Sequence, residues 1–212
     1  MTTEKIYAEL SAIRAILSDN GFGIALARLD DLTAALYDDI KKAELKKTKG
    51  NDFVKRSELI RKLLVKTNPF KTEFQKAWKE TINGDIYQIA MMNGYYCFAF
   101  KNPLDLPEHT ANDKPCNAER FFTRPTELEE IKIDVAEIKT AYKLHKATKT
   151  KDRHITKIGQ KYFDSEYILN IVSALGENIT IYQTTNKLNF DFFENENGTA
   201  LLMPVRPPKN EN

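Results

Sequence analysis

The stretch GQKYFDSEYILNIVSALGENITIYQTTNKLNFDFFENENGTALLMPVR, residues 159–206, has the clearest pattern of structural elements in the chain. It begins with a helix bounded by Asp164 or Ser165, whose side chains accept hydrogen bonds from the first turn, and by Gly176, which can end a helix in the left-handed conformation. Between these bounds, apolar residues recur at helical spacing. They form one face, which consists of Tyr167, Ile168, Ile171, Val172 and Leu175.

After Gly176 the apolar pattern changes from helical spacing to alternation, which is typical of strands. Three runs alternate in this way, at residues 179–182, 188–193 and 201–206. Reversals are expected at Asn186 and at Asn197-Gly198, because these residue types favour turns. We therefore predict an α+β fold in which this helix covers a three-stranded antiparallel meander.

The order of these elements resembles the half-domain repeat of the bacterial DNA polymerase sliding clamp. It looks closer still to short clamp-like proteins of phages and mobile elements, which end in a similar run. The matching residues are 167–169 and 171–175 in the helix and Leu202-Met203-Pro204-Val205-Arg206 at the end. The resemblance implies one clamp-like domain at residues 52–207, with two halves at about 52–125 and 126–207, each built from a helix and antiparallel strands.

In the sliding-clamp family, the end of the chain and its neighbouring strands line an apolar groove that accepts short motifs of client proteins. The resemblance therefore implies a partner-binding site at Met203, Pro204, Val205 and Arg206. The alternative that these residues simply form an edge of the core stays open, since Pro207 and further polar residues follow them.

The first 48 residues predict a helical hairpin. Apolar residues recur at helical spacing between residues 4 and 18 and again from about 24 to 47, with Asp19-Asn20-Gly21 between them. A hairpin this short buries two apolar stripes poorly by itself, so it packs either on its own domain or on a second copy. In the second case we expect a homodimer or small oligomer, with Ile6, Leu10, Ile13, Leu17, Leu29 and Leu36 in or near the interface.

The middle of the chain has a less regular pattern. Its polar segment 46–52, which contains Gly50, predicts a linker. Residues 108–125 predict a loop. Helices are expected at 57–64, 71–81 and 135–148. Strands are expected at 85–92, 95–101 and 131–133, the first two joined by the hairpin signal Asn93-Gly94.

Basic residues concentrate in two parts of the chain, although the formal net charge is only +2. Residues 41–79 hold thirteen Lys and Arg against four acids, and residues 132–161 hold nine against three. This segregation favours a surface that binds double-stranded DNA through its phosphates, without sequence preference. A solvated lysine-rich face is the alternative. The expected DNA-binding residues are Lys55, Arg56, Arg61, Lys62, Lys139, Lys143 and Lys146.

The sequence holds no catalytic motif. His109, His145 and His154 lack metal-ligand spacing, and no phosphate-binding or nucleophile motif occurs. Two close carboxylate pairs are more typical of turns and surfaces than of catalysis: Asp105 with Glu108, and Glu194 with Glu196. We therefore expect no enzyme activity, no metal and no cofactor.

The two cysteines, Cys97 and Cys116, lack metal-type spacing and favour a reducing compartment. Cys97 lies among aromatic residues, which indicates a buried structural thiol. No export signal and no membrane-spanning run is found, so we expect a cytoplasmic protein.

Three functions remain open on this reading. The first is a non-enzymatic clamp-like accessory factor of a phage or mobile element, which binds DNA or recruits replication or repair proteins. The second is a clamp-fold protein that binds and inhibits a host protein, with little affinity for DNA. The third is an enzyme with a dispersed site, which a pocket of convergent carboxylates or histidines would favour.

Overall fold

The computed structural model describes residues 3–18, 21–110, 113–149, 152–186 and 189–207. The chain divides into two compact units, residues 1–55 and 56–212. The first unit holds α1 (Thr3–Ser18) and α2 (Phe22–Lys49), and α3 (Asn51–Thr67) continues from it into the second. The predicted linker 46–52 is therefore wrong, because helix occupies both sides and only Gly50, at φ 90°, interrupts it.

The first unit is the predicted helical hairpin, here called the arm (α1 and α2). Ile13 of α1 packs against Ala25 and Leu32 of α2, and all three are buried. Ile16 and Leu36 lie beside them and are partly buried. The arm thus has a core of its own, but a very small one.

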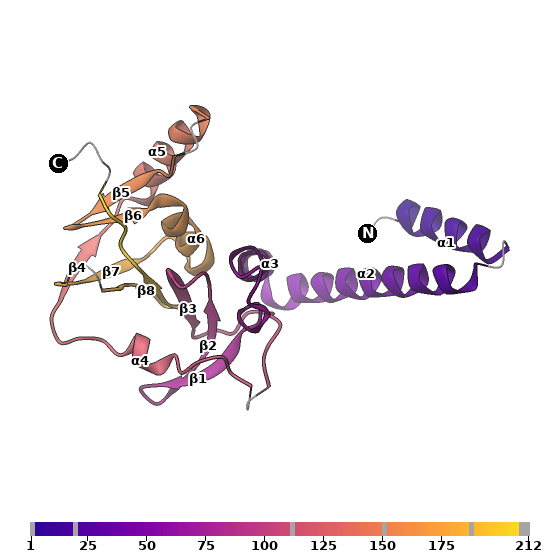
Figure 1. Ribbon diagram of the computed structural model, residues 1–212, viewed down its shortest axis with the longest axis horizontal. Coiled ribbons are helices and arrows are strands. Elements are labelled where there is room, and N and C mark those ends of the chain that lie inside the picture. The colour runs from indigo at the N-terminus through magenta and orange to yellow at the C-terminus, as the bar shows by residue number, and fades with distance from the viewer. Residues whose placement is uncertain (1–2, 19–20, 111–112, 150–151, 187–188, 208–212) are drawn as a thin grey trace. The chain divides into compact units, whose positions relative to one another are not determined.

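A single antiparallel sheet organises the second unit (Figure 1). Within the described residues its seven strands follow the order β1-β2-β3-β9-β8-β7-β4. They are β1 (Trp78–Ile82), β2 (Asp85–Met91), β3 (Tyr96–Phe100), β4 (Leu128–Lys132), β7 (Thr180–Thr184), β8 (Asp191–Asn195) and β9 (Gly198–Leu202). A separate hairpin of β5 (Ile155–Ile158) and β6 (Lys161–Asp164) precedes α6 (Ser165–Leu175).

Two halves of similar build make up this unit, as expected. In each half a helix is followed by a three-stranded meander: α3 by β1, β2 and β3, and α6 by β7, β8 and β9. The halves join where β3 pairs with β9, with Phe98 opposite Ala200 at the centre. Gly198 begins β9 at φ 150°, and a Cβ there would collide with the carbonyl oxygen of Ala99. The close approach of β3 and β9 therefore requires glycine.

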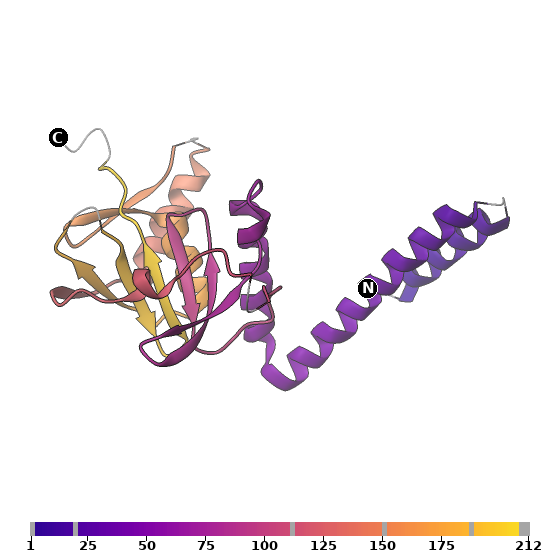
Figure 2. The same cartoon turned by 60° about the horizontal axis from the view of Figure 1, so that its bottom comes forward.

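Helices cover one face of the sheet and the segment that carries α4 (Glu119–Phe122) crosses the other (Figures 1 and 2). α3 runs antiparallel to α6, since Arg56 contacts Ala174 and Lys66 contacts Glu166. α5 (Val135–Ala147) lies along α6 on the side away from α3. Because both faces are covered, every residue of β3 is buried, whichever way its side chain points.

The predicted helix at 165–175 is confirmed with its caps. The Asp164 carboxylate accepts a hydrogen bond from the Glu166 amide, and Gly176 ends the helix at φ 116°. The hairpin at Asn93-Gly94, the strand near 131–133 and the helix near 135–148 are confirmed as well. Leu188, which was expected in a strand, lies outside the described residues.

The predicted helix at 71–81 is wrong. Only the short 3-10 turn η1 (Thr72–Phe74) is helical, and β1 follows it. Trp78, Glu80 and Ile82 alternate as buried residues and pair with β2, so the apolar spacing that suggested a helix is that of a strand. β5 and β6 were not predicted from the residue pattern, because each is only four residues long.

Candidate functional site

Exposed lysines lie on the helical side of the second unit. Lys62 lies on the exposed side of α3, and Lys143 and Lys146 lie in the last turns of α5. The Lys146 ammonium lies 5.2 Å from the centre of the Tyr142 ring. Lys55 is also exposed, in the first unit, 3.9 Å from Asp52. These four predicted DNA-binding residues are accessible to a ligand.

The other three predicted DNA-binding residues have partners within the fold. Arg56 Nε donates to the Ala174 carbonyl at 2.5 Å, and Arg61 Nε donates to the Asp105 carbonyl at 2.7 Å. Arg61 also forms an ion pair with the Asp105 carboxylate, and Lys139 forms one with Glu177. The two arginines fasten α3 to neighbouring segments, which leaves exposed lysines as the main cations of this surface.

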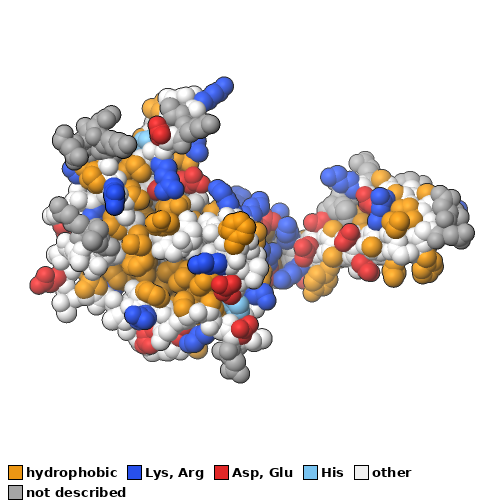
Figure 3. Space-filling view, viewed as in Figure 1, with side chains coloured by type: hydrophobic (Ala, Val, Ile, Leu, Met, Phe, Trp, Pro, Cys, Tyr) orange, Lys and Arg blue, Asp and Glu red, His pale blue; other side chains and the backbone are white. Residues whose placement is uncertain are grey.

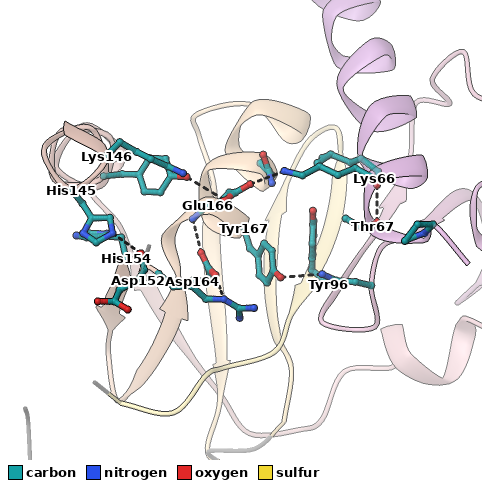
Figure 4. Close-up of a pocket in the computed structure, with 16 residues that line it drawn as sticks. Lys66, Thr67, Tyr96, His145, Lys146, Asp152, His154, Asp164, Glu166 and Tyr167 are labelled. Atoms are coloured by element: carbon teal, nitrogen blue, oxygen red, sulfur yellow. Dashed lines mark hydrogen bonds and ion pairs between the residues drawn. The ribbon is translucent and has the colours of Figure 1, made fainter. Parts of the chain in front are cut away.

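A pocket of about 660 Å³ opens between α3, α5 and the start of α6 (Figure 4). Its residues come from segments far apart in the sequence. The polar ones include Lys66, Asn93, His145, Lys146, Asp152, Arg153, His154, Asp164, Glu166 and Asn170. The aromatic ones are Tyr96, Tyr142 and Tyr167. We call this the three-helix pocket.

Two of the acids that line the three-helix pocket, Glu166 and Asp164, have partners inside it. Glu166 forms an ion pair with Lys66 at 3.2 Å and accepts a hydrogen bond from the Tyr142 hydroxyl at 3.3 Å. Asp164 caps α6 and lies 3.8 Å from Arg153. Burial raises the pKa of Asp164 despite these partners. These two carboxylates therefore hold the elements in place.

Two histidines face each other in the same pocket, with ring centres 5.1 Å apart. His145 contacts the Asp152 carbonyl at 2.7 Å through Nε2, and His154 contacts the Ser165 hydroxyl at 2.8 Å through Nδ1. Burial, and then the neighbouring His145, lower the pKa of His154, while Asp164 opposes this shift. The surroundings of His154 therefore favour its uncharged form.

Stacked tyrosines form one wall of the pocket. The rings of Tyr96 and Tyr167 are 4.7 Å apart and nearly parallel, and Tyr95 stacks on Tyr167 at 6.5 Å. Asn93 donates to the Tyr167 hydroxyl at 3.0 Å. Tyr96 is 1% exposed, and its hydroxyl faces Asn170 without a hydrogen bond of good geometry. The partly exposed Tyr167 therefore gives this wall flat apolar surface with a polar edge, and the buried Tyr96 supports its ring.

The convergence of histidines and carboxylates is the feature that was expected to favour a dispersed enzyme site. In this pocket, however, Glu166, Asp164 and His154 each hold a partner within the fold. Ser165 beside His154 is fully buried, so it cannot meet a substrate. The described residues include no group of three or more potential ligands that could hold a metal ion. The partners of Glu166, Asp164 and His154 give these side chains a structural role.

Sequence reasoning identified only part of this pocket. Lys146 was expected at a binding surface, whereas Lys66 and Arg153 were counted only as part of the basic excess. Tyr167 was expected in the apolar face of its helix and instead lies partly exposed beside Tyr96. These residues come together because α3 packs beside α6. The contact between the two helices cannot be predicted from the residues close to either one in the sequence.

The predicted partner-binding residues lie along an edge of the fold. Met203 and Val205 donate backbone hydrogen bonds to Tyr95 and Tyr162, at 2.8 and 2.7 Å. Met203, Pro204 and Val205 are half-buried, and Arg206 is exposed. A small apolar pocket of about 140 Å³ lies nearby, and its lining includes Leu201 but none of these four residues. It opens on the sheet face crossed by α4, where hydrophobic side chains gather (Figure 3).

Lys161 was counted as part of a basic surface, and the structure corrects this. Its side chain is 2% exposed and forms an ion pair at 2.6 Å with Asp191, whose side chain is completely buried. Thr184 Oγ1 and the Asn189 carbonyl accept its other hydrogen bonds. Lys161 therefore has a structural role.

Cys97 is buried, as expected, and burial raises the pKa of its thiol. None of the described helices has the length and apolar character needed to cross a membrane. Comparison of the chain with protein-family models, with curated proteins and with solved structures finds no match.

Proposed function

We propose that this chain is a non-enzymatic, clamp-like accessory protein that binds duplex DNA without sequence preference. The observation that carries the proposal is the placement of lysines from two helices, α3 and α5, around one pocket. Lys66 and Lys146 both line the three-helix pocket, and Lys62 and Lys143 lie one turn earlier on their helices. Lys66 is paired with Glu166, so the proposal depends on Lys62, Lys143 and Lys146. Their charges therefore lie on the same side of the second unit.

The chemistry of these cations supports non-specific binding. Lysine carries a compact point charge that suits phosphate contacts, whereas arginine reads base edges with its planar fork. The two arginines of α3 already donate to carbonyl groups within the fold. A surface dominated by lysine neutralises phosphates without reading bases.

The arrangement of the two halves supports the clamp-like part of the proposal. Each half holds a helix followed by a three-stranded meander, and the meanders join into one sheet at β3 and β9. The two helices lie side by side on one face of that sheet. The resemblance of residues 159–206 to a sliding-clamp half-domain implies such a build.

The test is the salt dependence of binding to a fluorescent 20-base-pair duplex. Replacing Lys62, Lys143 and Lys146 together by Gln should weaken binding and flatten the plot of log affinity against log salt, by about 0.9 for each phosphate that the protein no longer neutralises. Replacing Lys101 and Lys132, which are exposed outside these helices, serves as the control. Unchanged affinity and slope in the triple variant, or no binding by the parent at low salt, would favour a clamp-fold protein directed at a protein partner.

A further inference from the structure

The arm exposes large apolar side chains although it has room to bury few. Phe22 is 72% exposed, Ile40 58% and Leu26 52%. The others are Leu10, Leu17, Ile24, Leu29 and Tyr37. Single exposed apolar residues are ordinary on a protein surface, whereas a contiguous set indicates an interaction site.

Helical spacing places most of these residues on one side of the hairpin. Successive residues of an α-helix are rotated by about 100° around its axis. In α1, this places Leu10 and Leu17 roughly 40–60° around the axis from the buried Ile13. In α2, Leu26, Leu29 and Ile40 are rotated from the buried Ala25 by roughly 40–100° in the same sense. Because the two helices are antiparallel, rotation in the same sense brings both stripes to the same side of the contact. Figure 3 shows hydrophobic side chains gathered along one side of the arm.

We propose that this apolar side of the arm binds the same side of a second copy, forming an antiparallel four-helix bundle. The exposed parts of Leu10, Leu17, Phe22, Leu26, Leu29, Tyr37 and Ile40 amount to on the order of 700 Å² per copy, close to the ~800 Å² per partner of a stable interface. A second copy presents the same stripe, so one contact repeated by a two-fold axis covers both.

The charge around the stripe argues for a protein occupant. Residues 3–39, which carry all of these exposed apolar residues except Ile40, hold seven acids against three bases, which disfavours both DNA and an anionic membrane surface there. The end of α2, residues 41–49, holds five bases against one acid and lies beyond the stripe. The small intramolecular core of Ile13, Ala25 and Leu32 supports a hairpin only weakly. Pairing with a second copy enlarges that core, as in other four-helix bundles.

The first experiment is light scattering of the full chain after size-exclusion chromatography, at concentrations from about 1 to 100 μM. The parent should have the mass of a dimer. Leu17→Lys with Leu29→Lys, one substitution on each helix of the stripe, should give a monomer. Ile24→Lys with Ala35→Lys is the matched control, because these exposed positions lie on the opposite side of α2, and it should remain dimeric. A parent that is monomeric at 100 μM, or a stripe variant that stays dimeric, would overturn the proposal.

A second experiment covers the case in which the stripe variant loses its helices. In a Cys116→Ser background, Leu29→Cys should form a disulfide-linked dimer under mild oxidation, and Ile24→Cys should not. Equal cross-linking of both would show that the stripe is not the contact. Binding of DNA to the second unit is measured separately, so failure of the dimer leaves the proposed function to its own test.

Discussion

The two units of this protein differ most in how each buries its apolar residues. The sheet unit buries both faces of its central strands, and Tyr96, Phe98 and Phe100 of β3 are at most 1% exposed. The arm buries Ile13, Ala25 and Leu32 and leaves larger residues in solvent. A unit with a complete core can use its surface for charge, whereas one with an incomplete core needs a partner. Substitutions in each unit can test this contrast.

The largest effect is expected inside the sheet unit, at the buried ion pair. Lys161→Met leaves the Asp191 carboxylate buried without its cation, so the free energy of unfolding should fall by about 3–5 kcal/mol. Urea unfolding followed by the fluorescence of Trp78, the single tryptophan, measures this. The double variant Lys161→Met with Asp191→Asn removes both charges and keeps an acceptor for the Thr184 amide, so it should recover part of the loss. Equal loss in both variants would mean that packing, not charge, is responsible.

A glycine comparison should show the next largest effect. Gly198→Ala forces a Cβ against the backbone of β3 at a positive φ, so the sheet unit should lose about 3 kcal/mol. Gly23→Ala in α2 meets no atom within 4 Å and replaces glycine in a helix, so it should be neutral or stabilise by up to about 1 kcal/mol. Urea unfolding followed by circular dichroism compares the two. Similar losses from both would contradict the account of the β3 and β9 contact.

Leu32→Ala tests the core of the arm. Leu32 is 6% exposed, and its truncation should destabilise the arm by about 2 kcal/mol, at the low end for leucine because its surroundings are small. Thermal loss of helicity should begin at lower temperature, while the unfolding of the sheet unit reported by Trp78 should not change. A parallel shift of both signals would show that the two units unfold together.

The smallest effect concerns pH. The fold lowers the pKa of His154, so the unfolded chain binds more protons as the pH falls through about 6.5, and stability is lost on acidification. Asp164, with a raised pKa, acts in the opposite direction, but at lower pH. His145, Tyr142 and Ser165 also lie beside His154. His154→Asn should flatten the change in melting temperature between about pH 7.5 and 5.5, and an unchanged slope would assign it to other groups.

Local signals were sufficient for much of the fold. Asp164 and Gly176 bound a helix because capping acts within a few residues, and Asn93-Gly94 formed its hairpin for the same reason. The prediction of a helix at 71–81 was wrong because Phe74 and Trp78 are four residues apart. This spacing fits one face of a helix, but it also occurs where a turn leads into a strand. When the partner of a side chain lies far away in the sequence, the residues around that side chain do not predict the contact. Lys161 was therefore taken for a surface charge, and Lys66 and Arg153 were not assigned to a pocket.

The position of β9 has a consequence for synthesis of the chain. β9 lies between β3 and β8 in the sheet, yet it is the last strand in chain order. Until the ribosome has made β9, the edge of β3 that will pair with it is free, and this edge runs beside Phe98 and Phe100. Such an edge pairs readily with other chains. The sheet unit therefore completes its fold only after residues 198–202 have left the ribosome, and a chain that stops before them is prone to aggregate.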